Sequence, residues 1–335
     1  MKPMERLQLL VIAQALSLAA ADPAAALDLS RDDVRAFEVE MEQKHGFDPA
    51  WLDSLLREAR SVPRIIELMN RPAERVKPWH EYRAHFLTEQ RISEGARFWA
   101  EHRARLEQVE QDSGVPARVI VAILGVETFY GRITGKIRVI DALSTLAFDY
   151  PPRSPYFRAE LEQFLLLTRE EQVDPVAATG SYAGAMGYPQ FMPRSYRAYA
   201  VDGDADGRRD LWSSIDDVLA SIANYLREHG WRAGEPIVVP AQLYFADAEG
   251  LVAGSIVANE TVGSLRAKGL EFDTVLSDDA PALFIGVGGD GGPELRAGFH
   301  NFSVITRYNR SVLYALAVND LGESIEKRLA PDPAP

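Results

Sequence analysis

The chain has 335 residues, 47% of them hydrophobic and 25% charged, which is typical of a globular protein. Its formal net charge of −13, with no long basic run, argues against a nucleic-acid partner. The absence of cysteine excludes disulfide bonds and a lipid-modified N-terminal cysteine, and a chain of this length can bury a core without disulfides.

The first 26 residues have the order of an export signal. Lys2 and Arg6 precede an apolar stretch, Leu7–Ala21, and the small residues Ala24–Ala26 fit an A-x-A cleavage site. The stretch is shorter than the roughly 20 residues of a membrane span. The alternative is an amphipathic first helix. We expect residues 1–26 to be a signal peptide and the mature protein to be periplasmic, soluble, monomeric and without a stable membrane anchor.

Helical patterns dominate from about Asp28 to Gly230. Asp48 and Ser154 are each placed to cap a helix, with Pro49 and Pro155 following in the first turn. Apolar residues at helical spacing run through residues 92–114, and the run 115–131 predicts a buried helix. In residues 215–230 one apolar face carries Val218, Leu219, Ile222, Ala223 and Leu226.

The pattern changes after Gly234. Two short β-rich runs, at 236–245 and 280–287, are separated by Gly, Asp and Asn, so residues 235–300 predict a small β-rich domain. A helix follows at 311–329, and residues 330–335 form a polar tail that we expect to be disordered.

One carboxylate stands directly behind an apolar run. On a helix, Glu127 falls at i+7 from Ile120 and i+3 from Leu124, so it lies on an apolar stripe. A carboxyl group in apolar surroundings has a raised pKa, as a general acid near neutral pH requires. The alternative is a structural ion pair with a nearby arginine such as Arg132.

Residues 180–200 combine three glycines, two prolines and four tyrosines, which excludes a regular helix throughout. Glycine permits close approach of the backbone to a ligand, and tyrosine offers an apolar ring with a polar tip. Ser181 and Gln190 can supply fixed hydrogen bonds. The alternative is an ordinary loop packed on a core.

A run of alternating acids predicts a calcium loop. Counted from Asp202, acids stand at loop positions 1, 3, 5 and 9, and Gly207 is at position 6, as in an EF-hand. Position 12 is Ser213 instead of glutamate, and Asp216 can close a longer loop. Arg208 contributes only its backbone carbonyl. The alternative is a solvated acidic turn.

Other motifs carry no function. The run Gly286–Gly291 matches G-x-G-x-x-G, but Pro293 follows it instead of a helix start, so it does not indicate a dinucleotide site. The six histidines lack H-E-x-x-H spacing, and no G-x-S-x-G is present.

Together these segments resemble the lytic transglycosylase B family, murein-cleaving enzymes related to goose-type lysozyme. The matching stretches keep the family's order from about residue 75 to 325. They are Pro78–Arg83, Gly125–Arg132, Asp141–Phe157, Gly180–Tyr196, the loop from Asp202, Ala223–Trp231 and Ile305–Asn309.

The resemblance implies a mainly α (α+β) fold with a lysozyme-like helical catalytic core, a surrounding α domain and a small β-rich domain. It places the N-terminal part of the α domain at 27–100 and the core at 101–234, with the calcium loop at 202–216. The β-rich domain then occupies 235–300. Residues 301–329 return to the core or α domain as a C-terminal helix.

The resemblance also assigns site residues. The single catalytic acid is Glu127. Saccharide contacts fall on Tyr82, Arg153, Ser181, Met186, Gln190, Tyr225, Tyr308 and Tyr314. The calcium ligands are Asp202, Asp204, Asp206, the carbonyl of Arg208, and Asp216. Three positions depart from the family. Pro152 stands where a second arginine is common, Pro189 where a small residue is common, and Arg194 where a serine is common. These departures concern the contacts with the glycan, not the reaction.

The implied activity is cleavage of the MurNAc-β-1,4-GlcNAc bond of peptidoglycan without water, leaving a 1,6-anhydro end. Glu127 acts first as acid and then as base, Ser181 and Gln190 orient the N-acetyl group and the acid, and calcium is structural, with no catalytic cofactor. The expected partner is the peptidoglycan glycan strand, with recruitment to cell-wall complexes. The alternatives are a muramidase that uses water and a non-catalytic murein-binding scaffold.

Overall fold

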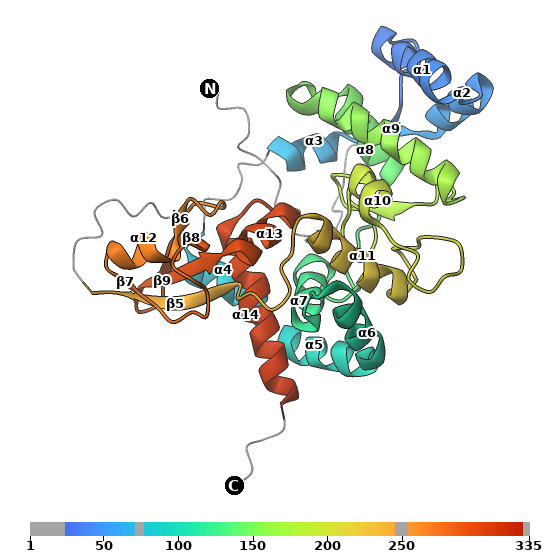
Figure 1. The fold of residues 1–335 in the computed structure, drawn as a ribbon. Helices are drawn as coiled ribbons and strands as arrows, with labels where there is room; N and C mark the ends of the chain where they lie inside the picture. The colour runs from blue at the N-terminus through green and yellow to red at the C-terminus, as the bar shows by residue number, and fades with distance from the viewer. Residues whose placement is uncertain (1–23, 71–76, 245–253, 331–335) are drawn as a thin grey trace. The chain divides into compact units, whose positions relative to one another are not determined.

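The computed structural model describes residues 24–70, 77–244 and 254–330, which divide into two compact units (Figure 1). The sheet unit comprises the described residues of 73–130 and 222–330, and the helical unit those of 24–72 and 131–221. The predicted signal peptide lies outside the described residues except for Ala24–Ala26, and residues 331–335 of the predicted tail also lie outside them. None of the helices in the described part of the chain has the length and apolar character that a bilayer span requires.

The helical unit is built around α8 (Val139–Phe148), whose residues are all buried, and α9 (Ser154–Glu170), which packs on it. A two-stranded sheet joins β1 (Ala25–Ala26) to β2 (Arg60–Ser61), and another joins β3 (Ile137–Arg138) to β4 (Thr179–Gly180). The other elements are α1 (Asp32–His45), α2 (Pro49–Glu58), α3 (Pro63–Asn70), the 3₁₀ turn η1 (Pro151–Arg153), α10 (Pro193–Tyr199) and the start of α11 (Ile215–Glu228).

The sheet unit has α7 (Ala117–Thr128) at its centre. Nearly every residue of α7 is buried, because the run from Val119 to Val126 is apolar on all sides. It packs against α5 (Glu89–Glu101), α6 (Arg103–Ser113) and α14 (Val312–Leu329). The backbone of α14 comes close to α7 at Gly322, where an added Cβ would lie 2.8 Å from the Arg118 carbonyl oxygen.

A five-stranded antiparallel sheet completes this unit, in the order β6-β8-β9-β5-β7 (Figure 1). Its strands are β5 (Val238–Leu243), β6 (Glu260–Thr261), β7 (Leu270–Glu271), β8 (Pro281–Gly289) and β9 (Gly292–Phe299). Helix α12 (Val262–Ala267) closes a small core with Phe284 and Phe299, while α4 (Trp79–Phe86) and α13 (His300–Tyr308) also contact the sheet. The G-x-G-x-x-G match lies at the end of β8 and in the turn to β9, so a strand and not a helix follows it.

Most predicted elements are confirmed. Asp48 caps α2 by accepting the backbone N–H of Trp51 at 2.8 Å, the β-rich run forms the sheet, and all five apolar residues predicted along α11 are buried. Two expectations were wrong. The run 92–114 is two helices that meet at His102, and Ser154 lies inside α9, where its hydroxyl donates to the Ala147 carbonyl instead of capping the helix.

The predicted domain boundaries differ from the two compact units. The contacts group residues 131–221 with 24–70, and residues 77–130 with 222–330, so they do not divide the chain at 101 and 234. The boundary at 221 falls inside α11. The assignment of a catalytic core to 101–234 therefore stays a prediction about function.

A buried ion pair joins the sheet to two helices. Arg296 on β9 donates to the two carboxylate oxygens of Asp320 on α14 at 2.6 and 2.8 Å, and the side chains are 15% and 9% exposed. The guanidinium also lies over the ring of Trp79 on α4, 5.7 Å from its centroid. Glu294 accepts hydrogen bonds from both Arg296 and Trp79 at 3.1 Å.

We expect Asp320→Asn to lower the free energy of unfolding by about 1.5–3 kcal/mol, because it removes the doubly bonded carboxylate of Asp320 and leaves Arg296 with the carboxylate of Glu294. Urea denaturation followed by circular dichroism measures this. Asp53→Asn is the control, since its pair with Arg57 is 44% and 65% exposed and its loss should cost less than about 1 kcal/mol. Equal losses in the two variants would contradict the assignment.

Candidate functional site

Glu127 is the penultimate residue of α7, just before an unusual turn. Phe129 and Tyr130 both have left-handed backbone conformations, with φ of 52° and 58°, and Gly131 follows at 83°. The helix ends there because the N–H of Tyr130 returns to the Leu124 carbonyl at 3.1 Å. The carboxyl group is thus placed at the end of a rigid, buried helix.

Four tyrosines of the sheet unit form a cluster around Glu127: Tyr82, Tyr225, Tyr308 and Tyr314. The hydroxyl of Tyr314 on α14 donates to Glu127 Oε1 at 2.7 Å. The Tyr308 ring stacks on Tyr314 with centroids 6.4 Å apart, and it meets Tyr225 edge-on at 4.9 Å. The Tyr225 hydroxyl donates to the Arg307 carbonyl at 2.7 Å, which holds α11 against α13.

Burial dominates the electrostatics of Glu127. It raises the pKa of the carboxyl from 4.5 to about 7, and the hydrogen bond from Tyr314 opposes this by stabilising the ionised form. Part of the side chain stays accessible to solvent, so the packing around the carboxyl, not complete enclosure, causes the shift. Near neutral pH, Glu127 is therefore present in both protonation states.

The neighbouring tyrosines remain neutral. Burial, followed by the Glu127 charge, raises the pKa of Tyr82, Tyr308 and Tyr314 above the usual value. The hydroxyl of Tyr82 is buried and has no hydrogen-bond partner among the residues that the structure describes. A buried hydroxyl without a partner is costly, so a ligand group that accepts its proton would be favoured.

Four predicted saccharide contacts lie in the helical unit: Arg153, Ser181, Met186 and Gln190. Ser181 and Met186 hold the Gly/Pro/Tyr segment in a tight loop. The Ser181 hydroxyl accepts the backbone N–H groups of Ala183 and Ala185 at 3.3 and 3.1 Å. Met186 is fully buried and pairs with Phe191 through the backbone, and Arg153 in η1 stacks on Tyr156 at 4.5 Å.

Gln190 is held in a strained and fixed position. Its φ is 53°, and its side-chain amide donates to the carbonyls of Thr134 at 3.0 Å and Gly187 at 2.9 Å. These bonds fix the orientation of the amide, and its Oε1 is buried with no hydrogen-bond partner in the described part of the chain. The loop is tight enough that a Cβ on Gly187 would lie 2.2 Å from the Leu211 carbonyl oxygen.

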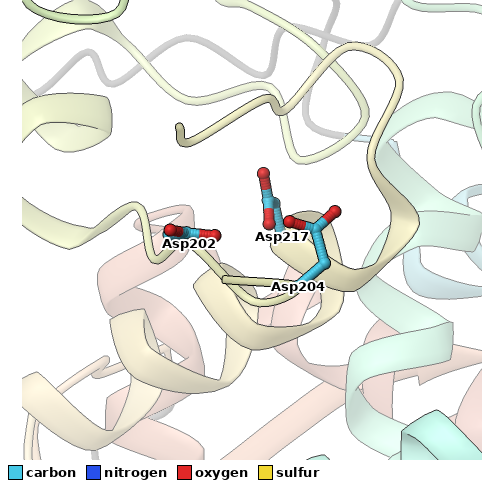
Figure 2. Close-up of side chains that lie close together, drawn as sticks. All are labelled: Asp202, Asp204 and Asp217. Atoms are coloured by element: carbon cyan, nitrogen blue, oxygen red, sulfur yellow. The ribbon is translucent and has the colours of Figure 1, made fainter. Parts of the chain in front are cut away.

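The acidic loop brings together Asp202, Asp204 and Asp217 (Figure 2). Each offers a carboxylate oxygen, and these oxygens lie within 4.8 Å of one another. Two oxygens bound to one Ca²⁺ at 2.3–2.6 Å are at most about 5 Å apart, so this set fits calcium. The carboxylate of Asp202 also accepts the N–H groups of Asp206 and Gly207, at 3.1 and 2.9 Å, which shapes the loop.

The predicted ligand set and the structure agree only in part. Among the described residues, the close carboxylate group contains Asp217 and neither Asp206 nor Asp216. Asp217 is buried, and its two oxygens accept backbone N–H groups from Gly203 at 2.7 Å and Asp210 at 2.6 Å. Asp206 accepts the N–H of Arg208 at 2.8 Å. The roles of Asp206, Asp216 and the Arg208 carbonyl as ligands stay predictions.

Sequence reasoning missed Asp217. The signal was present, because Asp217 lies four residues before the fully buried Ser221 and shares its face of α11. Asp217 lies on a buried polar face of α11 beside the calcium-type loop. An acid in that position is better placed to complete the loop than Asp216, which lies on the adjacent face.

Residues 30–323 match the family described as the transglycosylase SLT domain. The chain belongs to this family. It is 40% identical over 302 residues to membrane-bound lytic murein transglycosylase B of Escherichia coli K12, which covers 88% of this chain and 82% of that protein. The family membership confirms the predicted resemblance.

Solved structures of family members have the same fold. The catenated lytic transglycosylase SltB1 of Pseudomonas aeruginosa is 48% identical, with a TM-score of 0.86 over 90% of this chain and 99% of that chain. Escherichia coli lytic transglycosylase Slt35 in complex with calcium is 38% identical, with a TM-score of 0.83 over 91% and 96%. These likenesses confirm the expected lysozyme-like, mainly helical fold with a small sheet.

One further family structure carries a glycan. SltB3 of Pseudomonas aeruginosa in complex with NAG-anhNAM-pentapeptide is 32% identical to this chain, with a TM-score of 0.78 over 87% of this chain and 78% of that one. That ligand contains an anhydro-muramyl sugar.

Glu127→Gln is expected to stabilise the protein above neutral pH. Folding raises the pKa of Glu127 from 4.5 to about 7, so the stability from the protonated carboxyl is complete below pH 4.5 and is lost as pH rises through about 7. The amide does not titrate. At about pH 8.5 the variant should gain up to roughly 3 kcal/mol relative to wild type, and this gain should vanish near pH 4.

Urea denaturation at several pH values measures this difference. Glu107→Gln is the control, at an exposed carboxylate on α6. A pH-independent difference between wild type and Glu127→Gln would show that Glu127 is not desolvated in the folded state.

Proposed function

We propose that this chain is a lytic transglycosylase that cleaves the MurNAc-β-1,4-GlcNAc bond of peptidoglycan and leaves a 1,6-anhydro-muramyl end. The observation that carries the proposal is the Glu127 carboxyl, with a pKa of about 7 and a hydrogen bond from Tyr314. A group with this pKa can donate and accept a proton in one cycle near neutral pH. The ligand in the SltB3 complex, an anhydro-muramyl glycopeptide, supports this product class.

In the first step, protonated Glu127 donates its proton to the glycosidic oxygen. The bond from this oxygen to C1 of the muramyl sugar breaks, and the GlcNAc side leaves with a free 4-hydroxyl group. Because Tyr314 donates to Oε1 of Glu127, the proton to be transferred belongs on Oε2. The acetamido group of the muramyl sugar stabilises the positive charge at C1, in place of the second carboxylate that most glycosidases use.

In the second step, ionised Glu127 takes the proton of the muramyl C6 hydroxyl. The C6 oxygen attacks C1 and forms the 1,6-anhydro ring, and Glu127 returns to its protonated state. No water is consumed. The Tyr314 hydroxyl stabilises the carboxylate between the steps, which keeps the acid and base forms close in free energy.

The tyrosine cluster and the helical-unit loop supply the proposed glycan contacts. Within residues 24–70, 77–244 and 254–330, the buried hydroxyl of Tyr82 and the buried Oε1 of Gln190 have no hydrogen-bond partner, so we assign each to a polar group of the sugar. We assign saccharide contacts also to Tyr225, Tyr308, Tyr314, Arg153, Ser181 and Met186, as the family resemblance implies. The rings of Tyr225 and Tyr308 offer apolar faces for sugar rings.

The proposed setting is the periplasm, where the exported chain acts as a monomer on glycan strands and is recruited to cell-wall complexes. The basic and apolar order of residues 1–26 and the absence of cysteine support this setting.

Calcium has a structural place in this proposal. The oxygens of Asp202, Asp204 and Asp217 suit a hard cation, and a complex of Slt35 with calcium supports the same ion here. A bound ion would screen the repulsion of three close carboxylates in the helical unit. It takes no part in bond breaking.

Product analysis tests the reaction. Mass spectrometry of purified murein digested with wild type should show 1,6-anhydro-muramyl ends, and Glu127→Gln should lower the rate by at least about 100-fold, since the amide cannot transfer the proton. Glu107→Gln should digest at the wild-type rate. Hydrated reducing ends alone would indicate a muramidase, and unchanged digestion by Glu127→Gln would show that Glu127 is not the acid.

Thermal unfolding tests the calcium site. Added calcium should raise the melting temperature of the chelator-treated protein, because an ion that binds only the folded state stabilises it. The increase should be lost in Asp202→Asn and Asp204→Asn and retained in Asp290→Asn, whose carboxylate lies in the exposed β8–β9 turn. A melting temperature indifferent to both chelator and calcium would contradict the site.

A further inference from the structure

Arg91, in the first turn of α5, lies between two aromatic rings of the sheet unit. Its guanidinium carbon is 5.2 Å from the ring centroid of Phe86 at the end of α4, and 5.0 Å from that of Phe129 directly after α7. Its Nη1 donates to the carbonyl of His85 at 2.6 Å. One side chain therefore joins the ends of two helices, and these helices carry Tyr82 and Glu127.

The backbone of Arg91 also contacts the turn after α7. Its carbonyl accepts the hydroxyl of Tyr130 at 2.8 Å, and its N–H donates to the capping hydroxyl of Thr88 at 3.2 Å. The Tyr130 ring fits between α5 and α7 because each helix has a glycine at the point where it contacts Tyr130. A Cβ on Gly95 or Gly125 would lie 2.4 or 2.6 Å from the Tyr130 hydroxyl oxygen.

The position is costly for an arginine. A cation in the first turn of a helix opposes the helix dipole. Burial lowers the pKa of the guanidinium, and its Nε is buried with no hydrogen-bond partner among the described residues. Helix stability therefore does not explain Arg91, whereas its two ring contacts and the carbonyl of His85 do.

The turn that Arg91 contacts needs external support. Phe129 and Tyr130 have positive φ, which is a strained conformation for a residue other than glycine. Such a turn persists only where surrounding contacts hold it. Glu127 lies two residues before it, so movement of the turn displaces the carboxyl.

We propose that Arg91 is a positioning residue for Glu127. By contacting the rings of Phe86 and Phe129 with its guanidinium, it holds the turn after α7 and keeps the Glu127 carboxyl within reach of Tyr314. The proposal rests on the proposed function, in which Glu127 is the acid and base. Arg91 does not touch the substrate in this role.

Kinetics on soluble murein glycan strands test the role. We expect Arg91→Met, which keeps an unbranched side chain and removes the planar cation, to lower kcat about 10-fold and to leave KM within about twofold. Arg91→Lys should recover little, because an ammonium cannot stack between two rings. Arg97→Met is the matched control on the same helix, where the arginine is 60% exposed, and it should keep the wild-type kcat.

The pH profile separates positioning from general destabilisation. If the carboxyl moves into water, its pKa falls from about 7 towards 4.5, so the alkaline limb of kcat/KM should move to lower pH in Arg91→Met. The groups that face Glu127 from the neighbouring helices are Tyr82 on α4, Tyr308 on α13 and Tyr314 on α14, and the variant leaves them unchanged.

Phe129→Leu removes the contact between Arg91 and the turn after α7 from the other side. This variant keeps the test valid if Arg91→Met fails to fold. It should show a similar loss of kcat, and Arg91→Lys combined with Phe129→Leu should lose less than the sum of the single effects. A wild-type kcat and pH profile in the folded variants would overturn the proposal. If wild type makes no anhydro ends, the proposed function fails instead, and that outcome is distinct.

Discussion

A carboxyl group at the end of a buried helix costs free energy when it ionises, and the sheet unit is arranged around that cost. The apolar run of α7 removes water from Glu127 and raises its pKa to about 7. The hydrogen bond from the hydroxyl of Tyr314 replaces part of the solvation that the ionised carboxylate of Glu127 has lost. The balance of these two effects leaves the carboxyl able to give and take a proton at the same pH. A fully solvated glutamate would be too acidic for the first task, and a fully enclosed one could not reach a sugar.

Holding this group in place requires contacts far from it in sequence. The turn after α7 has two non-glycine residues with positive φ, and it is supported by Tyr130 against α5 and by Arg91 between Phe86 and Phe129. The buried pair of Arg296 and Asp320 ties the sheet to α14, the helix that carries Tyr314. The small sheet therefore helps to fix the position of one hydrogen-bond donor to Glu127.

In the helical unit, the contacts hold a segment of irregular backbone in a fixed conformation. Residues 180–191 use Ser181, a short backbone pairing at Met186 and close glycine contacts instead of a helix. The amide of Gln190 is fixed by the carbonyls of Thr134 and Gly187. In the acidic loop, carboxylates that accept backbone N–H groups shape the chain before any ion is considered. Rigid loops of this kind lose little entropy when a ligand binds.

Much of this protein was predictable from local pattern. Helical spacing placed Glu127 on an apolar stripe, the β-rich composition after Gly234 indicated the sheet, and alternating acids marked the loop from Asp202. Local pattern failed where a neighbour decides the outcome. The 92–114 helix breaks at His102, and Asp217 joins the carboxylates in place of Asp216, because the facing loop donates its N–H groups to Asp217. The sequence by itself identified Glu127 as an acid on an apolar stripe and the loop from Asp202 as a candidate cation site. Only the tertiary structure decided the pKa of Glu127, its donor from α14 and the clamp at Arg91, since desolvation and long-range contacts exist only in the folded chain.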